Sequence, residues 1–165
     1  MLSADGRHIV FTQFTIDPAL RATSVWSVLT EGRGNVQPVP AQWDAYPSAV
    51  SSDGRTLYYY AYQSDQPQSD ILSLAIAGAT AKPTLLLATP ASEELPVPSP
   101  DGRWLAYQTN ASGRAEVRLA PFTDLTAFVQ VSIRGGNPIR WSRDSSTLYY
   151  TDGDAITAVD LGAGG

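Results

Sequence analysis

Short segments in which apolar and polar positions alternate run along most of the chain, separated by Gly, Pro, Asp, Asn and Ser. In the segment 104–110, Leu105 and Tyr107 lie two residues apart, which places both side chains on one face of a strand. No helix is predicted, because Gly78 and Pro83 interrupt an Ala-rich stretch. The pattern predicts further strands at 47–51, 56–63, 70–76, 83–89, 95–99, 116–120, 128–133 and 137–142.

One phrase precedes the strand pattern four times. It reads SADGRHIVF from Ser3, SSDGRTLYY from Ser51, SPDGRWLAY from Ser99 and SRDSSTLYY from Ser142. The Asp of the phrase recurs at spacings of 48, 48 and 43 residues, close to the length of one propeller blade, about 40–50 residues. Because a catalytic residue is usually needed once, four copies indicate architecture.

The Asp-Gly pair predicts a turn, since Asp bonds its own nearby backbone and Gly adopts positive φ at little steric cost. The fourth copy has Asp144-Ser145-Ser146 in place of Asp-Gly-Arg, which is a weaker turn signal and lacks the Arg. If the Arg were essential for chemistry in every unit, the fourth copy would have lost that chemistry. We therefore interpret the phrase as a corner between two strands.

Four-stranded antiparallel units in tandem predict an all-β propeller, with blades stacked around a central channel. A β-sandwich is the alternative, but it does not explain a phrase repeated at nearly constant spacing. We expect residues 1–165 to form a partial propeller with about 3.5 repeats of a six-bladed type. About 14 strands are predicted, whereas a six-bladed ring needs roughly 24. The expected units are 1–46, 47–94, 95–136 and 137–165.

Composition excludes several classes of function. The 165 residues are 43% hydrophobic, enough for a buried core, and the formal net charge is −5 without a Lys/Arg run, which argues against nucleic acid as a partner. No apolar run approaches the ~20 residues that span a bilayer, so direct membrane insertion is not expected. The absence of Cys excludes disulfides and thiolate metal sites.

No catalytic, cofactor-binding or metal-ligating residue is predicted. His8 is the only His, and its counterparts in the other units are Thr56, Trp104 and Thr147, which favours an ordinary strand position over a catalytic base or ligand. The chain contains no G-x-S-x-G, H-R-D or D-F-G sequence. The segment 31–36 lacks the third Gly of a phosphate loop and is interpreted as a turn.

Three further features have a structural and a functional interpretation. Asp144, Asp152 and Asp154 could suggest calcium, but the ligand pattern is missing and a hairpin turn is favoured. Asn110 begins a formal glycosylation acceptor, interpreted as a surface turn. Alternation sends Tyr58, Tyr60 and Tyr62 to one face and Tyr59 to the other. We expect core between blades there, with a stacking platform for a peptide or sugar as the alternative.

With these residues assembled, the chain resembles the TolB-like β-propeller family, whose repeats carry S-P-D-G-x-x-L/I-A-F/Y. The phrase at 99–109 matches almost fully, while Ser142–Tyr150 lacks the Pro and Gly. The longer runs 93–122 and 135–161 resemble propellers fused behind bacterial serine/threonine kinase domains. The signature also occurs in TolB itself and in the propellers of prolyl-oligopeptidase-type peptidases.

That resemblance implies a non-catalytic interaction or ligand-sensing module, accessory to a bacterial signalling protein such as a kinase. The alternative is the substrate-gating propeller of a serine peptidase whose hydrolase domain is absent here. Expected partners are a protein or peptide, or a small ligand in the channel. The resemblance favours an extracytoplasmic location, and no cofactor is expected. An incomplete propeller also predicts self-association through its open edges.

Overall fold

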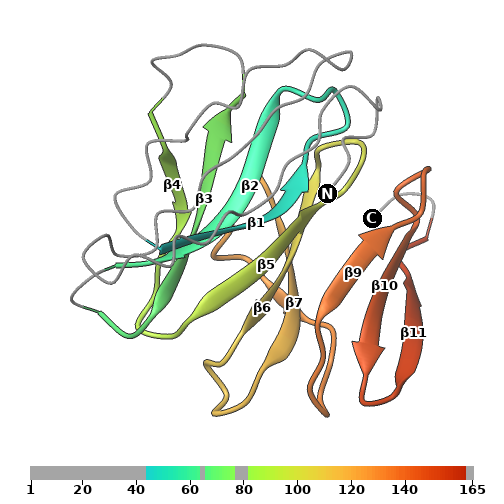
Figure 1. Cartoon of the computed structure of the whole chain (residues 1–165). Helices are drawn as coiled ribbons and strands as arrows, with labels where there is room; N and C mark the ends of the chain where they lie inside the picture. Colours follow the sequence, from blue (N-terminus) through green and yellow to red (C-terminus); the bar gives the residue numbers. More distant parts are fainter. Residues whose placement is uncertain (1–43, 64–65, 77–81, 163–165) are drawn as a thin grey trace.

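The computed structural model describes residues 44–63, 66–76 and 82–162, which form eleven strands in three antiparallel sheets and no helix (Figure 1). Each sheet is one blade. Blade 1 has the order β1 (Asp44–Val50), β2 (Thr56–Tyr62), β3 (Ser69–Ala75), β4 (Thr84–Leu87). Blade 2 has β5 (Glu93–Pro98), β6 (Trp104–Thr109), β7 (Glu116–Pro121), β8 (Val129–Gln130). Blade 3 has β9 (Pro138–Trp141), β10 (Thr147–Asp152) and β11 (Ala155–Asp160).

The predicted all-β propeller architecture is confirmed, and three consecutive sheets rather than two facing ones rule out the sandwich. Most predicted strands occur within two or three residues of their expected ends. The strand expected over 128–133 is shorter, and only Val129–Gln130 pair with β7. The first copy of the phrase, with His8, lies outside the described residues.

The blades stack through the faces that the alternation predicts. Between blades 1 and 2, and between blades 2 and 3, the forward face of the earlier blade packs against the back face of the later one. Leu105 and Tyr107 on the back face of blade 2 pack with Ile71 and Leu87 of blade 1. Each fully buried Leu or Ile stabilises the fold by about 1.5–3 kcal/mol. The aliphatic-aromatic pair is buried in every described blade, at Leu57 and Tyr59, Leu105 and Tyr107, and Leu148 and Tyr150.

The first strand of each blade, β1, β5 and β9, is the inner strand. β5 packs against β1, β2 and β3, and β9 packs against β5 and β6. Each inner strand has an irregularity in its pairing, close to Ser48, Leu95 and Ile139. Leu95 has a φ of 51°, a conformation that non-glycine residues rarely adopt. A bulge of this kind turns the neighbouring side chains in a new direction.

Candidate functional site

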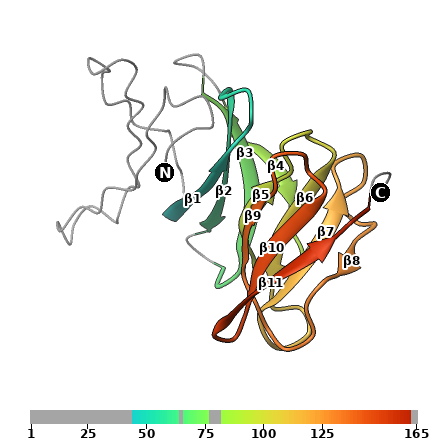
Figure 2. The ribbon, with the colours of Figure 1, turned by 90° about the vertical axis from the view of Figure 1, so that its right-hand side faces the viewer.

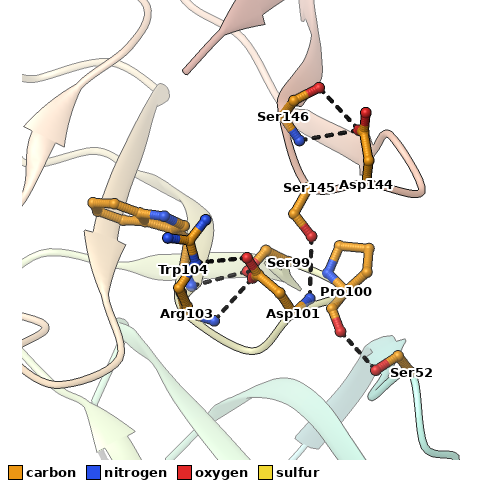
Figure 3. A network of polar contacts seen from close by, with 9 residues as sticks. All are labelled: Ser52, Ser99, Pro100, Asp101, Arg103, Trp104, Asp144, Ser145 and Ser146. Carbon is orange, nitrogen blue, oxygen red and sulfur yellow. Dashed lines mark hydrogen bonds and ion pairs between the residues drawn. The ribbon is translucent and has the colours of Figure 1, made fainter. Parts of the chain in front are cut away.

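The repeated phrase forms a closed hydrogen-bonded corner between the first two strands of a blade (Figure 3). In blade 2, the Ser99 hydroxyl donates to Asp101 Oδ1 at 2.6 Å and accepts from the Trp104 N–H at 2.9 Å. Asp101 Oδ1 also accepts from the Arg103 N–H at 3.1 Å. The Gly102 N–H donates to the Ser99 carbonyl at 2.9 Å, with a Gly102 φ of 73°. These bonds within the corner hold the chain in a reversed direction.

Blade 3 makes the same corner without Gly or Arg. Ser142 donates to Asp144 at 2.6 Å and accepts from the Thr147 N–H at 2.9 Å. Ser145 takes the place of the Gly and has a φ of 63°. The Ser146 hydroxyl donates to Asp144 at 2.9 Å. The interpretation of the phrase as a corner is therefore confirmed for the copies that the structure describes, and the Ser and Asp that these copies share form its hydrogen bonds.

Successive corners are bonded to one another, which the sequence analysis did not foresee. The Ser52 hydroxyl of blade 1 donates to the Pro100 carbonyl of blade 2 at 2.7 Å. The Asp101 N–H of blade 2 donates to the Ser145 hydroxyl of blade 3 at 3.1 Å. Figure 3 shows both contacts joining the three corners. In each of these contacts one partner is a backbone atom, so the side chains of the phrase do not by themselves predict the contact.

The corner carboxylates are held in their ionised form. Partial burial raises the pKa of Asp101, but hydrogen bonds from Ser99 and Arg103 outweigh it and lower the pKa to about 2. The Ser142 hydroxyl and then the Ser146 N–H and hydroxyl lower the pKa of Asp144 to about 2. Every acceptor bond favours the charged form. These Asp residues are thus structural acceptors rather than acids available for chemistry.

A different set of residues gathers at the opposite end of the strands, where the inner strands begin. Tyr46 stacks on Tyr60, with ring centroids 5.1 Å apart and planes 15° apart. Tyr62 meets both rings edge-on, at 6.0 Å from Tyr46 and 6.2 Å from Tyr60. The Tyr62 hydroxyl donates to Glu94 of blade 2. We call these four half-buried residues, Tyr46, Tyr60, Tyr62 and Glu94, the tyrosine surface.

The same end joins blades 2 and 3 by polar contacts. The Gln108 amide donates to the Asn137 side chain and, at 3.2 Å, to the Gly136 carbonyl. Asn137 stands five residues before its corner Ser, as Glu94 does in blade 2 and Tyr46 in blade 1. One repeat position thus carries a phenol, a carboxylate and an amide. This end varies from blade to blade where the corner end repeats.

Burial and hydrogen bonding hold the Tyr62 hydroxyl protonated. Burial first, then the hydrogen bond to Glu94, raises the pKa of Tyr62 to about 12. Glu94 also accepts from the Ser69 hydroxyl at 3.3 Å. Leu95, with its positive φ, directly follows Glu94 in the bulge. The carboxylate is therefore positioned by two donors from blade 1 and by the backbone of its own strand.

A second carboxylate at this end is fully buried. Glu93 is 1% exposed and accepts from the Thr89 hydroxyl at 2.6 Å, the Thr89 N–H at 3.2 Å and the Thr109 hydroxyl at 3.3 Å. Burial raises the pKa of Glu93, the Thr89 and Thr109 bonds oppose that rise, and nearby Asp70 adds to it. Burial therefore raises the pKa of Glu93 by more than the hydrogen bonds from Thr89 and Thr109 lower it.

Blade 2 also holds Glu116, 1% exposed, at the start of β7. Its carboxylate accepts from the Ser132 hydroxyl and from the Gly135 N–H at 3.0 Å, and pairs with Arg114 Nε at 2.8 Å. These contacts tie the end of the blade to the loop leading into blade 3. The partners of Glu116 lie in blade 2 and in the loop that leads into blade 3, so we assign Glu116 a role in connecting these two blades.

The three Asp residues that were considered as calcium ligands do not lie together. Asp144 lies in a corner, while Asp152 and Asp154 lie at the other end of β10, where Asp152 pairs with Arg134 at 2.6 Å. The Asp152↔Ala155 pairing leaves Gly153 and Asp154 as a hairpin turn, as favoured from sequence. Asn110 is exposed and its carbonyl accepts from the Gly113 N–H at 2.8 Å in a turn. Residues 31–36 lie outside the described ranges.

The tyrosine run divides as the alternation predicts. Tyr59 is buried on the back face, where burial raises its pKa to about 12. Tyr60 and Tyr62 belong to the tyrosine surface, and Tyr58 meets Phe122 with centroids 5.8 Å apart. Glu94 and Asn137 were missed, although their shared distance from the corner Ser was available in the sequence. Within residues 44–63, 66–76 and 82–162, no three His, Cys, Asp or Glu side chains are grouped to hold a metal ion. No described helix is long and apolar enough to cross a membrane.

Comparison with known proteins identifies the fold. No family model and no curated protein sequence matches the chain. Among solved structures, a protein assigned as TolB from Agrobacterium tumefaciens aligns over 97% of this chain and 60% of its own, with 18% identity and a TM-score of 0.77. TolB from Acinetobacter baumannii aligns over 97% of this chain and 40% of its own, with 15% identity and a TM-score of 0.63.

A prolyl endopeptidase structure also aligns, over 98% of this chain and 26% of its own, with 17% identity and a TM-score of 0.63. This chain therefore spans about three fifths or less of the proteins it matches. Two four-stranded blades and one three-stranded blade, bonded corner to corner, and these alignments lead to one conclusion: the chain has the fold of a TolB-type β-propeller.

Proposed function

We propose that this chain is a non-catalytic β-propeller module that binds a protein or peptide at the tyrosine surface. The observation that carries the proposal is the contrast between the two ends of the blades. The corner end repeats one hydrogen-bonded geometry, whereas the opposite end gathers three tyrosine rings and a carboxylate from two different blades. Variable side chains on a rigid repeated scaffold are the usual arrangement of a binding surface.

The chemistry of the tyrosine surface favours a cationic group on the partner. Tyrosine ring faces attract cations, and Glu94 adds a carboxylate beside them. An Arg or Lys side chain of a peptide satisfies both, since its charge meets the carboxylate and its stem covers the rings.

The test is a titration of the isotope-labelled chain with capped peptides Ser-Gly-Arg-Gly-Ser and Ser-Gly-Ala-Gly-Ser, followed by amide chemical shifts. The Arg peptide is expected to shift the signals of Tyr46, Tyr62 and Glu94, and the Ala peptide to shift none. Tyr46→Ala should weaken binding by about tenfold, as loss of a central aromatic does. The matched control is Leu85→Ala, on the outer strand β4 and 53% exposed. Equal response to both peptides, or shifts confined to β4, contradicts the proposal.

We further propose that the module is an accessory domain of a bacterial signalling protein such as a serine/threonine kinase. The runs 93–122 and 135–161 support that context. The alignment with a prolyl endopeptidase favours a second candidate, a propeller that gates access to a peptidase domain. The coding sequence around these 165 codons distinguishes them: H-R-D and D-F-G upstream support the kinase context, and a downstream G-x-S-x-G with Asp and His supports the peptidase.

A further inference from the structure

The Asp-Gly pair that builds the corners is also a chemically reactive pair. The backbone N atom of the Gly attacks the side-chain carboxyl carbon of the preceding Asp, and the missing Cβ of Gly leaves this approach unhindered. The amide proton and the carboxyl OH leave as water, and a succinimide ring closes. Water then opens the ring at either carbonyl and yields Asp or isoaspartate. Three such pairs lie in the described part of the chain, at Asp53, Asp101 and Asp152.

The corner of blade 2 holds both reacting groups in hydrogen bonds. Asp101 Oδ1 accepts from the Ser99 hydroxyl at 2.6 Å and from the Arg103 N–H at 3.1 Å. The Gly102 N–H donates to the Ser99 carbonyl at 2.9 Å. Attack therefore requires these bonds to open. The succinimide also forms from the protonated carboxyl. Although partial burial raises the pKa of Asp101, the hydrogen bonds lower it to about 2, so that form is scarce at neutral pH.

The corner of blade 1 holds its Asp-Gly pair in the same way. Asp53 Oδ1 accepts from the Ser51 hydroxyl at 2.5 Å and from the Arg55 N–H at 3.0 Å. The Gly54 N–H donates to the Ser51 carbonyl at 2.9 Å. The bond from Ser51, and then that from the Arg55 N–H, lowers the pKa of Asp53. Two corners thus restrain the same reaction with the same set of bonds.

The third pair, Asp152-Gly153, lies in a hairpin instead of a corner. Figure 2 shows its strands β10 and β11 nearest the viewer. Asp152 pairs with Ala155, and these flanking residues make the last bonds of the ladder, so the Gly153 N–H is not part of it. Gly153 is exposed, and a Cβ added there would meet no described atom within 4 Å. The Asp152 carboxylate pairs with Arg134, which is 76% exposed, and exposed ion pairs are weak.

We propose that Asp152 is a modification site at which isoaspartate forms, while the corners protect Asp53 and Asp101 from the same reaction. Isoaspartate carries the chain through the side-chain carbon, so the backbone gains a CH2 group at the end of β10. The preceding Thr151 donates its N–H to the Asn137 carbonyl at 3.0 Å, and its hydroxyl accepts from the Asn137 N–H at 2.9 Å. Isoaspartate at residue 152 is therefore expected to loosen the start of β9.

The test is prolonged incubation of the whole chain at neutral pH, followed by mass spectrometry with electron-transfer fragmentation, which distinguishes isoaspartate from aspartate at each position. Asp152 should accumulate isoaspartate about tenfold faster than Asp53 or Asp101, because reaction in a corner first requires its hydrogen bonds to open. In concentrated urea the three rates should become similar. Equal rates in the folded chain, or an order of rates that persists in urea, overturns the proposal.

The two corners supply a reciprocal pair of variants. Ser99→Ala removes the hydroxyl that serves Asp101, so isoaspartate should form faster at Asp101 and at an unchanged rate at Asp53. Ser51→Ala should reverse this result, with the faster reaction at Asp53. Each variant thus controls for the general loss of stability in the other, and circular dichroism establishes that the β structure is retained. Equal acceleration at both corners in either variant, or none, contradicts protection by the corner and overturns the proposal.

Discussion

The two ends of the blades carry carboxylates with opposite electrostatic roles. At the corner end, Asp101 and Asp144 are exposed, accept several hydrogen bonds, and have a pKa lowered to about 2. At the opposite end, Glu93 is buried, and burial raises its pKa. Carboxylates at both ends accept several hydrogen bonds, so the comparison shows that burial, rather than the number of donors, decides whether an acid supports this fold in its charged form.

Removing the Ser of a corner should have the largest effect. Ser99 is 3% exposed and serves both Asp101 and the Trp104 N–H. Ser99→Ala leaves that N–H without its acceptor and should lower the free energy of unfolding by about 2 kcal/mol. Urea denaturation measures the change. Ser112→Ala, in an exposed turn, is the control and should stay within about 0.5 kcal/mol. Equal losses of unfolding free energy in the two variants would mean that the hydrogen bonds of the corner stabilise the fold no more than those of an exposed turn.

Asp101→Asn tests the corner end through pH. The folded pKa of about 2 lies below the ordinary 3.8, so ionised Asp101 stabilises the fold above pH 3.8, and that stabilisation is lost as the pH falls toward 2. The side chain is 32% exposed, so solvent screening keeps the effect below about 1 kcal/mol. Unfolding midpoints of the two chains should differ at pH 7 and converge at pH 2. Asp154→Asn, in the exposed hairpin, serves as control.

Glu93→Gln tests the opposite end of the blades, where the change of stability with pH has the opposite sign. Since burial raises the folded pKa of Glu93, protonated Glu93 suits the fold, and that advantage is lost as the pH rises from the ordinary 4.5 through the raised value. Relative to Glu93→Gln, the unchanged chain should therefore lose stability as the pH rises above 4.5. Urea midpoints measured along this range give the slope. A difference that stays constant with pH contradicts the comparison.

The smallest effect is expected at Ser145, where two contributions oppose each other. Ser145→Gly relieves a left-handed backbone, worth about 1 kcal/mol, but removes the acceptor of the Asp101 N–H bond, worth about 0.5–1.5 kcal/mol. The net change in unfolding free energy should be near zero. Ser145→Ala keeps the backbone conformation and loses the bond, so it should be destabilising by about 1 kcal/mol. Thermal unfolding of both variants separates the two contributions.

Local pattern was enough to predict much of this fold. Alternation at Leu105 and Tyr107 predicted the buried back face, and repetition of the Asp-Gly pair predicted the corners. The tyrosine surface was only partly foreseen, because Tyr46 and Glu94 come from different blades and meet through the stacking of sheets.

The hydrogen bonds between corners have a consequence for the evolution of such a chain by duplication of its units. Ser52 reaches the carbonyl of Pro100, and the N–H of Asp101 reaches Ser145, so each contact joins one hydroxyl to one peptide group. A peptide carbonyl is present whatever the residue, and a peptide N–H is present at every residue except proline. A gene that duplicates one unit therefore adds a blade whose corner already offers a peptide partner to an adjacent serine, without any compensating substitution.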